Sequence, residues 1–169
     1  MRFLIIFIFL LSSSHANEVI DIKNLVINKE PIKYDSLTFL DAQKKKIDLN
    51  DYRGNLILLN FWATWCAPCK EEMPSLDLLQ VNENLDNLII FPINIGQDNL
   101  DKASSFYKEV KIKNLKLYFD SPITLAKKFG LRGVPTSILL NKEGLEFARI
   151  VGSIDFQEKE FVKWLSNYN

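Results

Sequence analysis

The sequence predicts an α/β fold whose sheet contains parallel strands and ends in an antiparallel hairpin. Two observations predict this class. Apolar runs typical of buried strands alternate with segments of helical spacing, and a tight turn joins the last two strand-like segments. The length of 169 residues suits one domain with a full hydrophobic core. The 21 basic and 21 acidic residues balance, so net charge does not indicate a nucleic-acid or anionic-membrane partner.

Residues 1–16 have the pattern of a cleavable secretory signal. Arg2 precedes an unbroken apolar run over residues 3–11, small residues then stand at positions 14 and 16, and we expect cleavage after Ala16. A retained membrane anchor is the alternative, but a span needs about 20 apolar residues and this run has about half as many. We therefore expect a protein of the periplasm or cell envelope that has lost its only histidine, His15.

Residues 17–34 are expected to form an N-terminal extension, followed by the folded domain over residues 35–169. The domain starts with a hairpin, because strand-like segments at 37–40 and 46–49 flank the polar turn DAQKK. An apolar run over residues 56–63, broken only by one asparagine, then predicts a buried central strand.

A helix is expected after this strand. Pro68 and the charged residues after it suit a first helical turn, and apolar residues then recur at helical spacing. Pro74 lies inside that pattern and should kink the helix. A second buried strand is predicted at residues 88–95, although Pro92 is unfavourable inside a strand.

The second half of the domain is expected to alternate again between helices and strands. Helices are predicted at residues 100–110, 123–129 and 156–166, and strands at 115–119, 136–140 and 145–151. Lys142-Glu143-Gly144 is typical of a tight turn and should join the last two strands as an antiparallel hairpin.

The only two cysteines, Cys66 and Cys69, lie in the stretch FWATWCAPCK. A closed zinc site needs about four ligands, whereas the mature chain offers two thiols and no histidine. A structural disulfide between them would close a very short loop and stabilise the fold little. A reactive dithiol without a bound metal or other cofactor is the favoured interpretation, and a copper or zinc carrier is the alternative from a different class.

The expected elements place Cys66 where a buried strand ends and a helix begins. The unpaired N–H groups and the dipole of a helix N-terminus stabilise a thiolate there and lower the thiol pKa. Cys69 follows one helical turn later and can reach back to the first sulfur. The position and the spacing both favour a reactive pair.

At these residues the chain resembles the thioredoxin superfamily. WCAPC after an apolar strand is its redox motif, and the longer string NFWATWCAPCKEEMP resembles the TlpA/ResA branch of exported reductants. A second match, GLRGVPT over residues 130–136, resembles the segment that carries the superfamily's cis-proline. The resemblance runs from about residue 34 to the C-terminus. It implies a thioredoxin fold with an N-terminal β-hairpin extension and a central insertion over residues 98–120.

The resemblance also implies roles for residues around the cysteines. Cys66 is the exposed nucleophile, and Cys69 resolves the mixed disulfide that Cys66 forms with a substrate. Trp65 is expected to be a partly exposed plate beside the sulfur. Pro68 stands where a histidine would stabilise the thiolate, which predicts a more reducing pair. Glu72 matches a glutamate that lies near the thiols and tunes their proton affinity.

Asn60 departs from the superfamily pattern, which places a buried aspartate there to handle the proton of the second cysteine. Asparagine cannot ionise, so that task is vacant or passes to Glu72. Pro135 is expected in the cis form, where it keeps a backbone N–H away from the thiols. Val134 before it is then free to pair its backbone with an extended substrate strand.

The resulting hypothesis is a periplasmic thiol–disulfide oxidoreductase that reduces disulfides of exported proteins. By resemblance, its substrates are oxidised CxxCH segments of apocytochrome c, during cytochrome c maturation, or a copper-site assembly protein. A membrane thiol reductant would supply its electrons. An oxidase or isomerase of exported proteins is the runner-up. A peroxidase is disfavoured, because the sequence has no separate peroxidatic cysteine.

Overall fold

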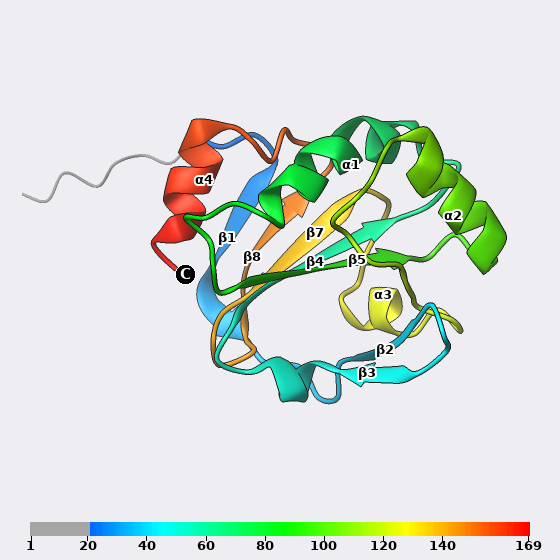
Figure 1. The fold of residues 1–169 in the computed structure, drawn as a ribbon. Helices are drawn as coiled ribbons and strands as arrows, with labels where there is room; N and C mark the ends of the chain where they lie inside the picture. The colour runs from blue at the N-terminus through cyan, green and yellow to red at the C-terminus, as the bar shows by residue number, and fades with distance from the viewer. Residues whose placement is uncertain (1–20) are drawn as a thin grey trace, which may run out of the picture.

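The fold is built on one mixed sheet of eight strands in the order β1-β8-β7-β4-β5-β6-β2-β3, in a computed structural model that describes residues 21–169 (Figure 1). The strands are β1 Leu25–Ile32, β2 Thr38–Asp41, β3 Lys46–Asp48, β4 Leu56–Trp62, β5 Leu88–Asn94, β6 Tyr118–Phe119, β7 Thr136–Leu140 and β8 Glu146–Val151. The helices are α1 Ala67–Leu79, α2 Leu100–Glu109, α3 Leu125–Lys128 and α4 Lys159–Ser166, with a 3-10 turn at Leu49–Tyr52. The predicted signal lies outside the described residues. Within residues 21–169, no helix is long and apolar enough to cross a membrane.

The centre of the sheet is β4, which pairs in parallel with β5 and antiparallel with β7. Every residue of β4 is buried, as its apolar run predicts. Because β4, β5 and β6 are parallel, the segments that follow them meet at one end of the sheet. The antiparallel β7 starts at this same end, where Thr136 pairs with Phe61.

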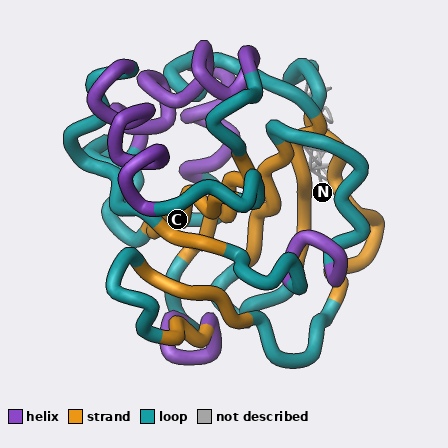
Figure 2. Tube along the Cα trace, turned by 90° about the vertical axis from the view of Figure 1, so that its right-hand side faces the viewer, coloured by secondary structure: helices purple, strands orange, loops and turns teal. Residues whose placement is uncertain are grey.

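Two apolar cores cover the two faces of the sheet. On one face, α1, α2 and α4 bury large side chains such as Trp62, Phe106 and Phe161 against the strands. On the other face, α3 and the β2–β3 hairpin enclose Phe39 and Phe91. Figures 1 and 2 show the three longer helices gathered on one side and α3 with the hairpin on the other. The predicted α/β class is confirmed.

The β2–β3 hairpin is present as predicted, and β2 also pairs with β6. The helix predicted at residues 156–166 begins later, at Lys159, and the backbone N–H groups of Phe156 and Gln157 donate to the side chains of Ser75 and Asp155. The strand predicted at 115–119 pairs only at its end. Its first backbone N–H, that of Leu115, donates instead to the carboxylate of Asp77 in α1.

Pro92 lies within β5 despite its unfavourable propensity. β5 pairs with β4 along its whole length but with β6 only at Ile93 and Asn94. Up to Pro92 one edge of β5 therefore has no neighbouring strand, and a residue without an N–H can be accommodated there.

The N-terminal extension contributes a strand that sequence reasoning did not predict. Residues 25–32 form β1, which pairs antiparallel with β8 and makes one edge of the sheet. Asn28 and Tyr34 fasten this segment to Glu146, through the backbone carbonyl at 3.1 Å and the carboxylate at 2.7 Å. The run NKEP in the middle of β1 hides the strand pattern, since charged residues and proline are rare in strand interiors.

Candidate redox site

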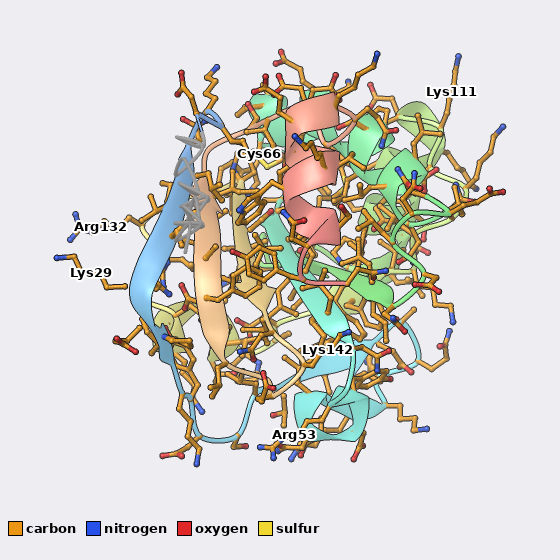
Figure 3. All side chains as sticks on the ribbon, turned by 90° about the vertical axis from the view of Figure 1, so that its left-hand side faces the viewer. Lys29, Arg53, Cys66, Lys111, Arg132 and Lys142 are labelled. Carbon is orange, nitrogen blue, oxygen red and sulfur yellow. A yellow bond between two sulfur atoms is a disulfide. The ribbon has the colours of Figure 1, made fainter. Side chains whose placement is uncertain are left out.

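Cys66 and Cys69 are joined by a disulfide bond at the N-terminus of α1. Cys66 is the N-cap residue of the helix, and its sulfur accepts a hydrogen bond from the backbone N–H of Cys69 at 3.2 Å. Figure 3 shows Cys66 at one end of the sheet, with Arg53 and Lys142 at the opposite end. After reduction, a Cys66 thiolate in this position would be stabilised by the helix dipole and the N–H groups of the first turn.

The two cysteine residues differ in exposure. Cys69 is fully buried, whereas Cys66 is 5% exposed, so an incoming disulfide can approach only from the Cys66 side. The sequence predicted that Cys66 would be exposed, and the structure shows that it is nearly buried. The surface around Cys66 is made by Trp65, which is 68% exposed, and by the exposed Pro68. The large exposed side chain of Trp65 thus directly precedes the nearly buried Cys66 in the chain.

Glu72 lies one helical turn after Cys69 and is only 3% exposed. The side-chain amide of Asn60 donates to Glu72 Oε1 at 2.8 Å and to the hydroxyl of Ser137 at 3.0 Å. Glu72 Oε2 and Asn60 Oδ1 have no hydrogen-bond partner within the described part of the chain. Burial raises the pKa of Glu72 from 4.5 to about 7, although the amide of Asn60 and the backbone of Ile154 oppose the shift.

Asn60 and Glu72, two separate candidates in the sequence, thus form one buried polar pair between β4 and α1. A carboxyl with a pKa near 7 can take up or release a proton at neutral pH. Sequence reasoning missed Ser137, the third member. Its signal was a serine within the buried strand TSILL.

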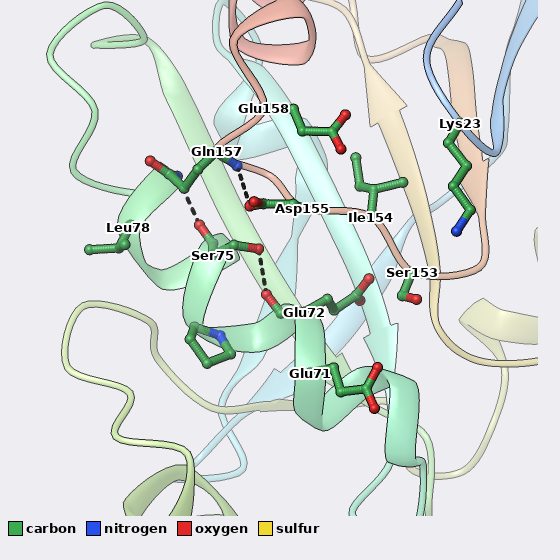
Figure 4. Close-up of a pocket in the computed structure, with 11 residues that line it drawn as sticks. Lys23, Glu71, Glu72, Ser75, Leu78, Ser153, Ile154, Asp155, Gln157 and Glu158 are labelled. Atoms are coloured by element: carbon green, nitrogen blue, oxygen red, sulfur yellow. Dashed lines mark hydrogen bonds between the residues drawn. The ribbon is translucent and has the colours of Figure 1, made fainter.

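A groove of about 560 Å³ runs beside Glu72, between α1 and residues 153–158. In Figure 4 the Glu72 carboxylate points from α1 toward Ser153, and Glu71 and Glu158 line the same groove. Glu72 is therefore buried but lies at the boundary between the core and a solvent-filled space. Glu71, by contrast, is exposed, as expected for an ordinary helix-surface residue.

The predicted cis peptide between Val134 and Pro135 is present. The pairing of Thr136 with Phe61 places these residues at the end of the sheet that carries Cys66. Pro135 accepts a backbone hydrogen bond from Gly152 at 3.0 Å. The N–H and C=O of Val134 make no hydrogen bond within residues 21–169, so both are available to a partner strand. A second cis peptide, before Pro122, was not predicted.

Another polar contact beside the cysteines was also missed. The carboxylate of Asp98, in the loop after β5, accepts hydrogen bonds from the backbone and the hydroxyl of Thr64, two residues before Cys66. A polar residue just after a buried parallel strand was the available signal, since such residues share the sheet end with the cysteines. Among the described residues, no group of three or more His, Cys, Asp or Glu side chains is arranged to hold a metal ion.

Comparisons with known proteins agree with this geometry. The family model described as "AhpC/TSA family" matches residues 32–145. The chain is 31% identical over 112 residues to "Thiol-disulfide oxidoreductase ResA" of Bacillus thuringiensis subsp. konkukian, a match covering 66% of this chain and 64% of that relative. It is 32% identical over 130 residues to "Thioredoxin-like protein YneN" of Bacillus subtilis, which covers 74% and 72% of the two chains.

The chain thus spans less than two thirds of the length of the ResA relative. Among solved structures, a thiol:disulfide interchange protein of the thioredoxin family from Chlorobium tepidum TLS has a TM-score of 0.66. The match covers 82% of this chain and 99% of that one, at 22% identity. This likeness confirms the thioredoxin fold.

Proposed function

The chain belongs to the AhpC/TSA family of thioredoxin-like proteins, and from that premise we propose that it is an exported thiol–disulfide oxidoreductase that acts as a reductant. The observation that carries the proposal is the disulfide between its only two cysteines, placed at the N-terminus of α1. Cys66 is slightly exposed and Cys69 is fully buried, which suits an attacking residue followed by a resolving one.

The reaction starts from the reduced pair. The Cys66 thiolate attacks one sulfur of a substrate disulfide and forms a mixed disulfide, while the other substrate sulfur leaves as a thiolate and takes up a proton. Cys69 then loses its proton and attacks the Cys66 sulfur. The second substrate thiol is released, and the Cys66–Cys69 disulfide of the structure is formed. Two electrons pass from the protein to the substrate.

Glu72 is the group we propose for the proton of Cys69. It follows Cys69 by one turn on the buried side of α1, and its pKa of about 7 allows it to accept a proton at neutral pH. Asn60 orients the carboxyl group through one hydrogen bond and leaves the second oxygen without a partner among the described residues. The groove beside Glu72 offers a route by which the proton can exchange with solvent.

Recognition of the substrate is proposed to use both sides of Cys66. An extended segment can pair with the unpaired backbone of Val134, and its apolar side chains can contact Trp65. By family resemblance we propose oxidised CxxCH segments of apocytochrome c or a copper-site assembly protein as substrates. A membrane thiol reductant of the periplasm or cell envelope would return the protein to its dithiol form.

A trapping experiment tests the dithiol chemistry. In Cys69→Ser the first thiol can still attack but nothing resolves the adduct, so covalent complexes with exported disulfide proteins should accumulate. Cys66→Ser should form none. The complexes are detected on non-reducing gels and disappear with dithiothreitol. Trapping by Cys66→Ser instead would mean that the two roles are reversed, and trapping by neither variant would contradict the proposed exchange reaction.

A further inference from the structure

A single buried carboxylate fastens the turn before Cys66 to the neighbouring loop. Asp98 accepts hydrogen bonds from the backbone N–H of Thr64 at 3.2 Å and from its hydroxyl at 2.9 Å. Asn94, at the end of β5, donates to the same group at 3.0 Å, and Lys102 of α2 forms an ion pair with it at 2.6 Å. The Asp98 side chain is only 1% exposed. Three parts of the fold therefore meet at this anion.

The residue that Asp98 holds is central to the turn. The backbone N–H of Cys66 donates to the carbonyl of Ala63 at 3.1 Å, so Thr64 and Trp65 are the two middle residues of a turn that ends at the cysteine. Trp65 is 68% exposed and gives the turn little packing. The two hydrogen bonds from Thr64 to Asp98 are then the main side-chain anchor of this segment.

Gly96 shows independently how closely the two segments approach. A Cβ atom at this position would lie 2.6 Å from Asp98 Oδ2 and 2.9 Å from Ala63 Cβ, both closer than real contacts allow. The backbone of Ile95 also donates to the carbonyl of Trp62 at 2.9 Å. The loop after β5 is thus packed directly against the start of the turn, with no space for another side chain.

We infer that Asp98 is a positioning residue for Cys66, an inference that rests on the dithiol function proposed above. By holding Thr64, Asp98 fixes the turn and keeps the Cys66 sulfur at the N-cap of α1. A turn released from this anchor lets the sulfur move away from the helix N-terminus, where its thiolate is stabilised. It also lowers the effective concentration of one thiol at the other.

Substitutions at Asp98 separate positioning from a direct effect of its charge. In Asp98→Ala the anchor is lost, so the pKa of the Cys66 thiol should rise by about one unit. The fraction of thiolate at neutral pH should then fall about tenfold. In Asp98→Asn the carbonyl can still accept from the Thr64 N–H while the amide donates to the hydroxyl. This variant removes the charge but keeps the turn, and its thiol pKa should stay within a few tenths of the wild-type value.

The measurement is the rate of alkylation of the reduced protein against pH. A lower pKa in both Asp98 variants would show that Asp98 acts only by its charge, because removing an anion favours the thiolate. An unchanged pKa in Asp98→Ala would contradict any effect on Cys66. Thr64→Val, which removes only the hydroxyl bond, should shift the pKa in the same direction as alanine but less, and it serves if Asp98→Ala does not fold.

Asp77→Ala is the matched control. Asp77 is another buried aspartate that holds a loop through backbone N–H groups, but that loop, residues 113–115, is not the one that precedes Cys66. Asp77→Ala should lower the stability of the protein without changing the pKa of the Cys66 thiol. A shift in this pKa equal to that in Asp98→Ala would mean that any destabilised variant shows the effect. Alkylation needs no substrate disulfide. If the wild-type protein reduces no substrate, the proposed function fails while the comparison of Asp98 variants is still decided.

Discussion

Helix α1 carries two buried carboxylates whose surroundings differ. The carboxylate of Asp77 accepts hydrogen bonds from the backbone N–H groups of residues 113–115, at 2.8–3.2 Å, and from the side chain of Asn114 at 2.9 Å. Glu72 accepts one side-chain hydrogen bond, from Asn60, with further support from the backbone of Ile154, and its Oε2 has no hydrogen-bond partner within residues 21–169. Buried polar groups are normally satisfied, so the incomplete one needs an explanation.

We interpret Asp77 as a structural carboxylate and propose that Glu72 is a functional one. Asp77 joins α1 to the segment before β6, and both of its carboxylate oxygens accept hydrogen bonds, which suits a fixed structural role. Glu72 is nearly as deeply buried but is weakly compensated, so its pKa rises to about 7 and its charge depends on pH. A carboxyl group with a pKa near 7 can exchange protons near neutral pH, which is the basis of the role we propose for Glu72.

The largest expected effect is on stability at Asp77. In Asp77→Ala the N–H groups of residues 113–115 lose their common acceptor, and Leu115 is itself buried. Leaving such groups without partners should reduce the free energy of unfolding by about 4 kcal/mol. Urea denaturation of the oxidised protein measures this loss. A change below about 1 kcal/mol would mean that water replaces the carboxylate and that Asp77 is not a structural anchor.

Removal of the Glu72 carboxylate should instead increase the free energy of unfolding, and only at high pH. The folded protein keeps its Glu72 proton up to about pH 7, whereas the unfolded chain loses it near 4.5. The unfolded state therefore binds fewer protons in this interval, and stability falls as pH rises through it. At about 1.4 kcal/mol per pKa unit the loss is about 3 kcal/mol above pH 7.

Denaturation of oxidised wild type and Glu72→Gln at pH 4 and pH 8 checks this prediction. The glutamine variant should be about 3 kcal/mol more stable than wild type at pH 8 and nearly equal to it at pH 4. Glu71→Gln, on the exposed side of the same turn, should follow the wild type at both values. The same pH dependence in wild type and Glu72→Gln would show that Glu72 titrates near its ordinary pKa.

A smaller effect is expected on the thiol. The Glu72 anion opposes formation of a second negative charge nearby, so Glu72→Gln should lower the pKa of Cys66 by on the order of one unit, about 1.4 kcal/mol. Thiolate absorbance against pH measures it. Glu71→Gln is again the control and should change the value much less. Equal small shifts of the Cys66 pKa in the two variants would mean that Glu72 does not influence the cysteines.

The sequence predicts features of this molecule that depend on neighbours in the chain. The buried β4, the helix after Cys66 and the β2–β3 hairpin follow from apolar runs and turn residues, and the cis peptide before Pro135 follows from a local motif. β1 was missed because its middle is charged and its strand character comes from pairing with β8.

Contacts between distant residues could not be predicted in the same way. Asn60 and Glu72 were both candidates, but the hydrogen bond between them depends on how α1 packs on β4. Ser137 reaches Asn60 across 77 positions, and Asp98 reaches Thr64 across 34, because sheet register and loop packing bring them together. A local sequence pattern does not show which distant residues will be in contact. It does show candidates for such contacts, namely polar residues within or just after apolar strands.

The reduction potential of the Cys66–Cys69 pair tests most directly whether the protein is a reductant. Pro68 offers no side-chain donor to a thiolate, and we propose that the Glu72 carboxylate opposes one, so neither should stabilise the reduced form as a histidine at position 68 would. Equilibration of the pure protein with dithiothreitol or glutathione buffers should give a value nearer that of thioredoxin, about −270 mV, than that of DsbA, about −120 mV. A value above about −180 mV, the potential of protein disulfide isomerase, would contradict a reductant and indicate an oxidase or isomerase.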